Sequence, residues 1–304
     1  QYEMGIRQSL TDNFAFTISG FYKDLRNQLR IDRLYATDSG QITVNPEMGN
    51  IVYCGYVNQD FGTIKGLEMT LELRRTNRLA ARVNYTFSDA RGTNSDSRTG
   101  SVVVSDEVTA RYPLLMYPLD FNQPHRGTMM LDYRFAKGDG GFLQGFGLNM
   151  LFTFNSGHAY TKVQEPENLG QADPWDVGVR ALRDARGRHP EEPLNNSLTP
   201  WNFMVDMNLN KVFYLGRINL DLYVNVLNLF NTKNVINVYP MTGVAEDDGW
   251  LSSPFASPFY QIPNYVDFYR TINGQNRWSY ILATGNDIYG IPRQVRVGVR
   301  LEFN

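Results

Sequence analysis

The feature that most limits the fold of this chain is a strict two-residue alternation of apolar and polar side chains. In residues 217–226, RINLDLYVNV, every even-numbered residue is apolar, and the odd-numbered ones are polar, charged or tyrosine. A β-strand with this period sends the two sets to opposite faces of its sheet. One face of such a strand therefore meets an apolar medium and the other meets a polar one.

The same alternation recurs along the chain and predicts an all-β fold. It is clearest in the C-terminal RQVRVGVRLEF, where Val295, Val297 and Val299 alternate with Arg296 and Arg300. No comparable stretch has the apolar spacing of an amphipathic helix. The predicted strands are residues 2–10, 14–35, 51–74, 78–88, 125–135, 143–154, 201–214, 216–228 and 293–303.

The connections between these strands are short turns and long polar loops in alternation. The long loops cover about 36–50, 89–124, 155–200 and 229–292, so all of them leave the same end of the sheet. That layout, with strands of about ten residues, is typical of a transmembrane antiparallel β-barrel with extracellular loops. A soluble β-sandwich, with its apolar side inward, fits loops of this length at one end less well. We therefore expect the apolar face to meet lipid and the polar face to line the lumen.

Composition argues against several other classes of protein. The chain carries 29 Lys and Arg against 31 Asp and Glu, which disfavours a nucleic-acid-binding surface. It has no apolar run of about 18 residues, as a transmembrane helix would require. The three histidines have no metal-ligand spacing, and no nucleophile motif occurs. The sequence therefore predicts no catalytic residue, no metal site and no cofactor.

The predicted number of strands, nine, does not fit a complete bacterial barrel, because such barrels have an even number of strands. An open sheet would also leave two unpaired edges. We interpret residues 1–304 as the C-terminal part of a single, larger barrel domain whose earlier strands precede residue 1. The segments 14–35 and 51–74 are longer than a membrane requires, and we expect them to project as a β-ribbon. The only cysteine, Cys54, would lie on this ribbon as an incidental packed residue.

Three segments of the chain resemble the TonB-dependent outer-membrane receptors. LYVNVLNLFNTKNV resembles the penultimate-strand signature of these receptors, and IKGLEMTLELRRTNRLAARVNYTFSDARG resembles an earlier strand, periplasmic turn and strand. GIPRQVRVGVRLEF resembles their closing strand, with Asn304 as a departure, because the family usually ends on the aromatic residue, here Phe303.

The resemblance implies a 22-stranded barrel plugged by an N-terminal domain, of which these are the last nine strands. It implies active import of a large scarce nutrient, such as an iron chelate, vitamin, glycan or peptide, across the bacterial outer membrane. The expected partners are membrane lipid, the plug, the periplasmic TonB complex and possible surface lipoproteins. A passive porin, or a structural barrel within a surface or secretion complex, is the alternative. The presence of a plug and a coupling motif upstream would distinguish them.

Two groups of residues are candidates for function. Outer-loop aromatics could bind substrate, although they could equally pack a core for their own loop; these are Trp175, Trp250, Tyr265, Tyr269 and Trp278. Charged residues of the polar faces would line the lumen and face the plug, or would merely be solvated there; these are Glu68, Glu72, Arg82, Asp132, Arg134, Asp206, Asp221, Arg296, Arg300 and Glu302.

Overall fold

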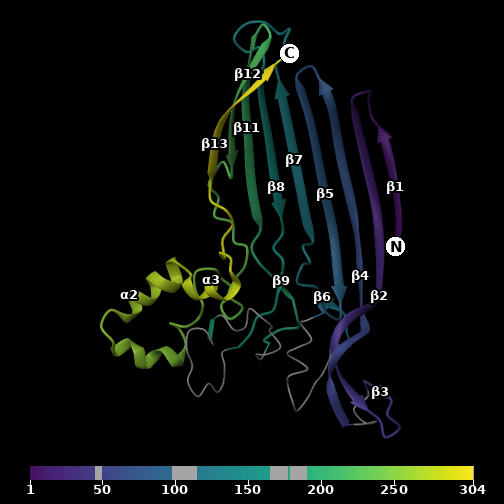
Figure 1. The fold of residues 1–304 in the computed structure, drawn as a ribbon, viewed down its shortest axis with the longest axis vertical. Helices are drawn as coiled ribbons and strands as arrows, with labels where there is room; N and C mark the ends of the chain where they lie inside the picture. Colours follow the sequence, from purple (N-terminus) through teal and green to yellow (C-terminus); the bar gives the residue numbers. More distant parts are fainter. Residues whose placement is uncertain (45–49, 98–114, 165–176, 179–189, 304) are drawn as a thin grey trace.

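In the part of the chain that the structure describes, nine long strands lie side by side in one antiparallel, curved sheet (Figure 1). The computed structural model describes residues 1–44, 50–97, 115–164, 177–178 and 190–303. Each long strand pairs with the next long strand in the chain, so the sheet has no crossover connection. The strands are β1 (Tyr2–Ser9), β2 (Phe14–Ala36), β4 (Asn50–Thr76), β5 (Leu79–Gly92), β7 (His125–Arg134), β8 (Phe146–Asn155), β11 (Asn202–Leu215), β12 (Ile218–Leu227) and β13 (Gln294–Phe303).

These strands confirm the nine segments predicted from the alternation, with boundaries that differ by one to four residues. The largest difference is at β5, which continues to Gly92 instead of residue 88, because its last residues still pair with β4. Two short strands, β3 (Ile42–Thr43) and β6 (Tyr117–Pro118), add to the edges of β2 and β5. The strands β9 (Ala159–Tyr160) and β10 (Ser197–Leu198) pair separately.

The connections lie as the strand order requires, with short turns at one end of the sheet and long segments at the other (Figure 1). At the short-turn end, Asn77 and Gly216 adopt positive φ angles of 57° and 72° in the tight turns before β5 and β12. Asparagine and glycine are the residues that tolerate this conformation. The opposite end, which we call the loop end, carries all the long connections.

The two longest strands, β2 and β4, extend past the loop end as a two-stranded ribbon (Figure 1). Their pairing shifts register between Leu25 and Gln28, where Asn27 has a φ of 55°, so a β-bulge marks the point where the ribbon leaves the sheet. Cys54 lies on this ribbon opposite Arg33, but it is exposed, so the expectation that it would be packed is wrong.

An aromatic belt crosses the apolar face near the loop end of β5, β7, β8 and β11. The ring of Trp201 stacks on His125 and Phe203, with centroids 5.5 Å and 6.1 Å apart. Phe152 continues the row from Phe203, at 6.4 Å. Rings of this kind are typical of the two interfaces of a membrane, where their apolar bodies and polar edges meet different media.

Residues 229–292, which we call the arm, form a folded unit of short helices that extends sideways from the loop end (Figure 1). The arm contains η5 (Pro254–Gln261), α2 (Tyr265–Tyr269), η6 (Arg270–Gln275) and α3 (Trp278–Thr284). The sequence predicted no helix here. With five to eight residues each, these helices are too short to show an apolar period, and they depend on tertiary packing. No helix in the described part of the chain is long and apolar enough to cross a bilayer.

Candidate functional site

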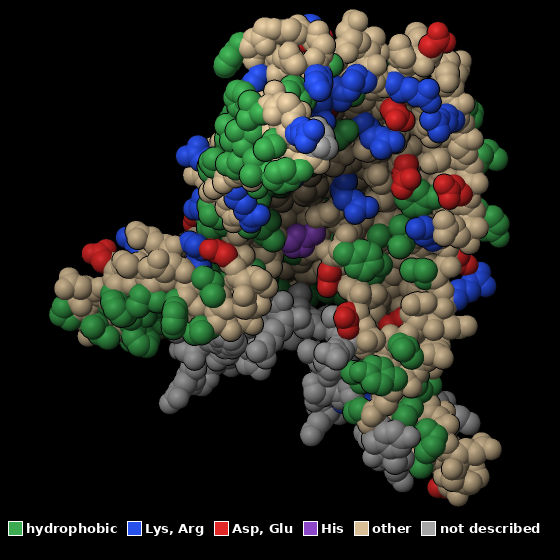
Figure 2. All heavy atoms as spheres, turned by 45° about the horizontal axis from the view of Figure 1, so that its top comes forward, with side chains coloured by type: hydrophobic (Ala, Val, Ile, Leu, Met, Phe, Trp, Pro, Cys, Tyr) green, Lys and Arg blue, Asp and Glu red, His purple; other side chains and the backbone are tan. Residues whose placement is uncertain are grey.

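All ten charged residues predicted for the lumen lie on one continuous face of the sheet, which we call the polar face. Directly paired residues of neighbouring strands share a face. Glu72 pairs with Arg82, and Asp221 pairs with Arg300. The same face continues from β7 to β12 through three further direct pairs, namely Asp132–Asn149, Asn149–Asn208 and Asn208–Asn225. Figure 2 looks into the hollow of the molecule, where side chains of both charge signs gather.

Two pairs of these charges contact one another, one pair across neighbouring strands and one within β7. The guanidinium of Arg82 lies 3.5 Å from the Glu72 carboxylate. Asp132 is the most buried member, with 6% of its surface exposed, and it accepts hydrogen bonds from Arg134 and Arg75. A buried carboxylate needs such partners because its desolvation is otherwise costly. Asp132 therefore has a structural role near the short-turn end as well as a place on the polar face.

Asparagines of the segment LYVNVLNLFNTKNV form a hydrogen-bond network that links the end of β12 to β11 and to the residues before β13. Asn228 is 1% exposed with a φ of 54°, and its side-chain amide donates to the carbonyls of Thr232 and Ile291, both at 3.0 Å. Its backbone N–H donates to Asp206, 2.8 Å away. The side chain of Asn234 pairs with both backbone groups of Phe203. The asparagines of this motif thus replace the strand partners that β11 and β13 lose where β12 ends.

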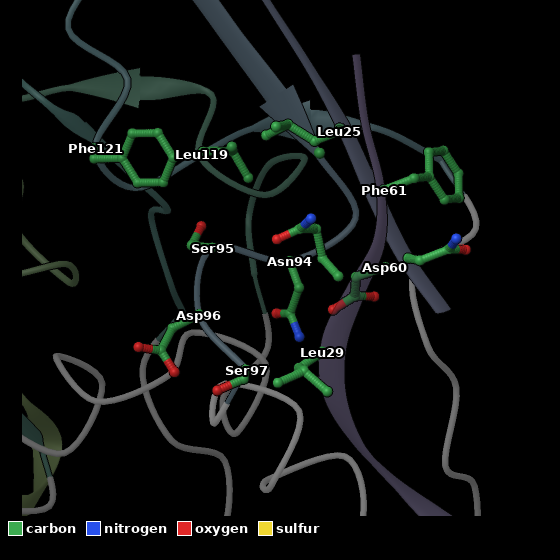
Figure 3. A pocket seen from close by; sticks show the side chains of 14 residues that line it. Leu25, Leu29, Asp60, Phe61, Asn94, Ser95, Asp96, Ser97, Leu119 and Phe121 are labelled. Carbon is green, nitrogen blue, oxygen red and sulfur yellow. The ribbon is translucent and has the colours of Figure 1, made fainter. Parts of the chain in front are cut away.

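A pocket of about 380 Å³, which we call the rim pocket, opens where the ribbon leaves the sheet (Figure 3). The bulge residues Leu25, Gln28 and Leu29 contribute to one wall, and segments 94–97 and 119–121 contribute others. Gly62 and Gly92 also line it and pair directly across β4 and β5. By the alternation of β4, Gly62 is on the same side as Glu68, so the rim pocket adjoins the polar face at the loop end.

A buried ion-pair network supports the rim pocket. Asp60 lines the pocket, is 5% exposed, and accepts a hydrogen bond of 3.0 Å from the Thr93 hydroxyl. The Arg30 guanidinium lies 3.6 Å from Asp60 and 2.8 Å from Asp32. Because these groups are largely out of water, they hold one another in a single geometry. The carboxylate of Asp60 is therefore positioned before any ligand arrives.

The predicted ligand-binding aromatics of the arm divide into buried and exposed side chains. Trp250 is fully buried and Tyr269 is 6% exposed; both belong to a core that also contains Val177 and Ala256. Tyr265 packs against this core, and its hydroxyl accepts a hydrogen bond of 2.8 Å from the Trp250 indole. These positions support the packing interpretation. Trp278 on α3 is 58% exposed, so its indole ring is accessible to a ligand. Trp175 lies outside the described residues.

The arm also contains a pocket of about 730 Å³ with an unusual buried carboxyl group. Asp248 accepts hydrogen bonds from the Tyr269 hydroxyl and the Trp250 backbone N–H, and burial raises the pKa of its carboxyl above the ordinary value. Lys233 lies 3.8 Å from the centroid of the Tyr289 ring. This arm pocket is lined by three basic and three acidic residues, namely Lys233, Arg270, Arg277, Glu246, Asp247 and Asp248.

The sequence did not indicate the rim pocket. Its one local signal is the break in alternation at Leu25-Arg26-Asn27-Gln28, which a single long predicted strand concealed. The contribution of Leu119 and Phe121 has no local signal, because a long connection carries them to β5. Among the described residues, no group of three or more His, Cys, Asp or Glu side chains is arranged to hold a metal ion.

Known structures share the fold. The outer membrane transporter YddB from Escherichia coli aligns with a TM-score of 0.50 and 12% identity, over 80% of this chain and 30% of that one. The FrpB iron transporter from Neisseria meningitidis gives 0.47 and 18%, over 98% and 30%. FpvA of P. aeruginosa, bound to heterologous pyoverdines, gives 0.49 and 12%, over 98% and 26%. The chain thus spans about 30% of the length of these proteins or less.

No curated protein sequence matches the chain. Residues 1–229 match the family described as "TonB dependent receptor-like, beta-barrel". This match covers β1 to β12, the strands that carry most of the polar face. The chain therefore belongs to the TonB-dependent receptors, as part of the β-barrel by which they span the outer membrane.

Proposed function

We propose that this chain contributes the last strands and several outer loops of an active importer that takes up a large, scarce nutrient. The observation that carries the proposal is the continuous polar face, on which ten charged residues from six of the long strands share one side of the sheet while the other side is largely apolar. In a closed barrel that face encloses a wet or protein-filled lumen, and the apolar face meets lipid.

The charges suit a lumen occupied by a plug. Glu68, Arg296 and Arg300 would face a separately folded N-terminal domain, and the TonB complex would couple to that domain from the periplasm. FrpB is an iron transporter and FpvA binds pyoverdines, but at 18% and 12% identity neither indicates the substrate of this chain. A surface lipoprotein that covers the loop end belongs to the same proposal. The substrate classes remain iron chelates, vitamins, glycans and peptides.

The test uses the complete receptor in its outer membrane. Uptake of a labelled cargo should stop when TonB is removed or the proton gradient is collapsed, while surface binding persists. Purified receptor in a planar bilayer should show little ionic conductance, because a plug fills the lumen. Steady open-channel conductance together with TonB-independent uptake would instead favour a porin. No uptake, together with stable association with other surface proteins, would favour a structural barrel.

A further inference from the structure

A third pocket, of about 280 Å³, lies at the loop end, where β8 ends and β11 begins beside the two ends of the arm (Figure 1). We call it the amide pocket, because four of its eleven described lining residues carry a carboxamide. Two of them, Asn155 and Asn202, pair directly in the same register that pairs Asn149 with Asn208. By the alternation of both strands they are on the polar face, so the amide pocket adjoins the lumen side of the sheet.

The described lining of the amide pocket carries no Asp, Glu, Lys or Arg. His158 is the one histidine among those residues, and burial lowers the pKa of its imidazole below the ordinary value of 6.5. The ring is therefore uncharged at neutral pH. The rim pocket and the arm pocket, by contrast, both include carboxylates. A charged ligand group would lose hydration in the amide pocket without meeting an opposite charge, so this lining favours an uncharged ligand.

Three of the four carboxamides have unused hydrogen-bonding capacity. The Oδ1 atom of Asn202 is buried and has no hydrogen-bond partner. The Nδ2 atom of Asn202 donates to the Oδ1 of Asn155 at 3.5 Å, which is long for a hydrogen bond. Among the described contacts, none engages the Nδ2 of Asn155 or the side-chain amide of Gln123. Asn234, the fourth carboxamide, is occupied by both backbone groups of Phe203.

This combination of unused groups limits the chemistry of a ligand. A buried amide oxygen without a partner is costly, and a ligand that donates a hydrogen bond to Asn202 would remove that cost. A carboxylate or a phosphate dianion has no proton to donate there. A hydroxyl group donates and accepts through one oxygen, so it can serve the acceptor of Asn202 and the neighbouring donor of Asn155 together. The geometry therefore favours a ligand with several hydroxyl groups.

The size and the apolar part of the lining indicate a compact ring. A volume of about 280 Å³ is just below the usual range for small-molecule sites, roughly 300–1,000 Å³, so the amide pocket suits one unit of a larger molecule. Met204, Ile236 and Ile291 provide aliphatic surface. The C–H groups of a sugar ring can pack against such a surface while its hydroxyl groups reach the amides.

We propose that the amide pocket binds one uncharged sugar ring of the imported molecule. One ring hydroxyl donates to the Oδ1 of Asn202 and accepts from the Nδ2 of Asn155, and a second contacts the amide of Gln123. The C–H face of the ring packs against Ile236 and Ile291. This inference rests on the proposed import function, and it identifies a neutral glycan as the substrate class that is recognised at the loop end.

The experiment measures binding to the complete purified receptor by calorimetry. The neutral probes are maltotriose, cellotriose and mannotriose. Trigalacturonate and the glucosamine trimer add a negative and a positive charge to each ring, and blocked triglycine offers uncharged peptide groups. We expect at least one neutral trisaccharide to bind about tenfold more tightly than the three other probes. Its affinity should not change when salt is raised, because no ion pair contributes to binding.

Two variants on separate segments locate the site. Asn202→Ala removes the unpartnered acceptor and Gln123→Ala removes the free amide. Each should weaken the neutral trisaccharide by about fivefold, as expected for the loss of one hydrogen bond. Asn58→Ala and Gln41→Ala make the same substitutions at exposed positions on the ribbon, and no change is expected for these matched controls. Heat-modifiable gel mobility verifies that each variant is folded.

The possible results are distinguishable. The sugar site would be overturned if no neutral trisaccharide bound, or if either test variant kept the full affinity. A preference for trigalacturonate or for the glucosamine trimer would overturn the selection of uncharged ligands. Tightest binding of triglycine, weakened by Asn202→Ala, would replace the sugar with a peptide. If no sugar binds while TonB-dependent uptake of another cargo persists, the inference fails and the import function stands. If sugars bind as expected but uptake is independent of TonB, the amide pocket stands and the energised import fails.

Discussion

The spanning sheet and the arm use aromatic residues in opposite ways. In the sheet, Trp201 is 47% exposed and stacks within a belt on the surface of the strands. In the arm, Trp250 is fully buried and helps to form a core. The comparison shows that position in a periodic strand determines the environment of a side chain in the sheet. In the arm, contacts between residues far apart in the chain determine it.

The largest effect should come from the core of the arm. Trp250→Ala should destabilise the arm by about 3–5 kcal/mol, because it removes a fully buried indole and leaves a cavity. Limited proteolysis of the complete receptor should then cut within residues 229–292 while heat-modifiable mobility of the barrel is unchanged. Trp278→Ala, at an exposed position of the same arm, is the control and should change protease resistance little. Equal sensitivity of the two variants would contradict the core.

The facing of the sheet can be tested on β12. Leu222→Arg should impair barrel assembly at a cost of about 2–4 kcal/mol, because the arginine would point into hydrocarbon near mid-depth. Asp221→Asn, one residue away on the polar face, should assemble almost normally. The readout is the fraction of protein with heat-modifiable gel mobility. The assigned facing would be wrong if both variants assembled equally well.

The junction between sheet and arm should show an intermediate effect. Asn228→Ala should destabilise the receptor by about 1–3 kcal/mol, because it leaves the carbonyls of Thr232 and Ile291 without their side-chain donor. Asn228→Gly permits the φ of 54° and so separates hydrogen bonding from backbone strain. The measurement is the temperature at which heat-modifiable mobility is lost. Asn219→Ala within β12 serves as the control. An equal decrease of the melting temperature in this variant would contradict a special role for the hydrogen bonds of Asn228.

A smaller effect should appear in the pH dependence of the arm. Because burial raises the pKa of Asp248, the folded arm binds a proton more readily than the unfolded one does. The stabilising contribution is full below the ordinary carboxyl value of 3.8 and is lost as the pH rises through the raised pKa. Protease resistance of the arm in urea should therefore fall over that window.

Asp287 gives the stability of the arm a pH dependence opposite to that of Asp248. The hydrogen bond from Arg277 lowers the pKa of the Asp287 carboxyl, so its contribution is present at neutral pH and is lost on acidification. The difference in protease resistance between the wild type and Asp248→Asn, measured at each pH, isolates the contribution of Asp248. An identical pH profile for both proteins would show that Asp248 does not titrate as its burial requires.

Sequence reasoning predicted the sheet well and the candidate sites unevenly. The ten charged residues predicted for the lumen were chosen from the alternation along each strand, and the register of the strands puts all of them on one face of the sheet. The aromatic residues of the arm were recognised, but whether they bind or pack was left open, and Trp250 and Tyr269 pack. The rim pocket was missed because it joins the bulge near Asn27 to Leu119 across a long connection.

The sequence by itself determined the all-β class, the nine strands, their two chemically distinct faces and the end from which the long loops leave. It could do so because a strand has a side-chain period of two and each strand pairs with its neighbour in the chain. Only the tertiary structure decided the helices of the arm, the burial of Trp250 and the network of Arg30, Asp32 and Asp60. These features depend on packing between segments that no local period connects, and short helices gain their stability from that packing.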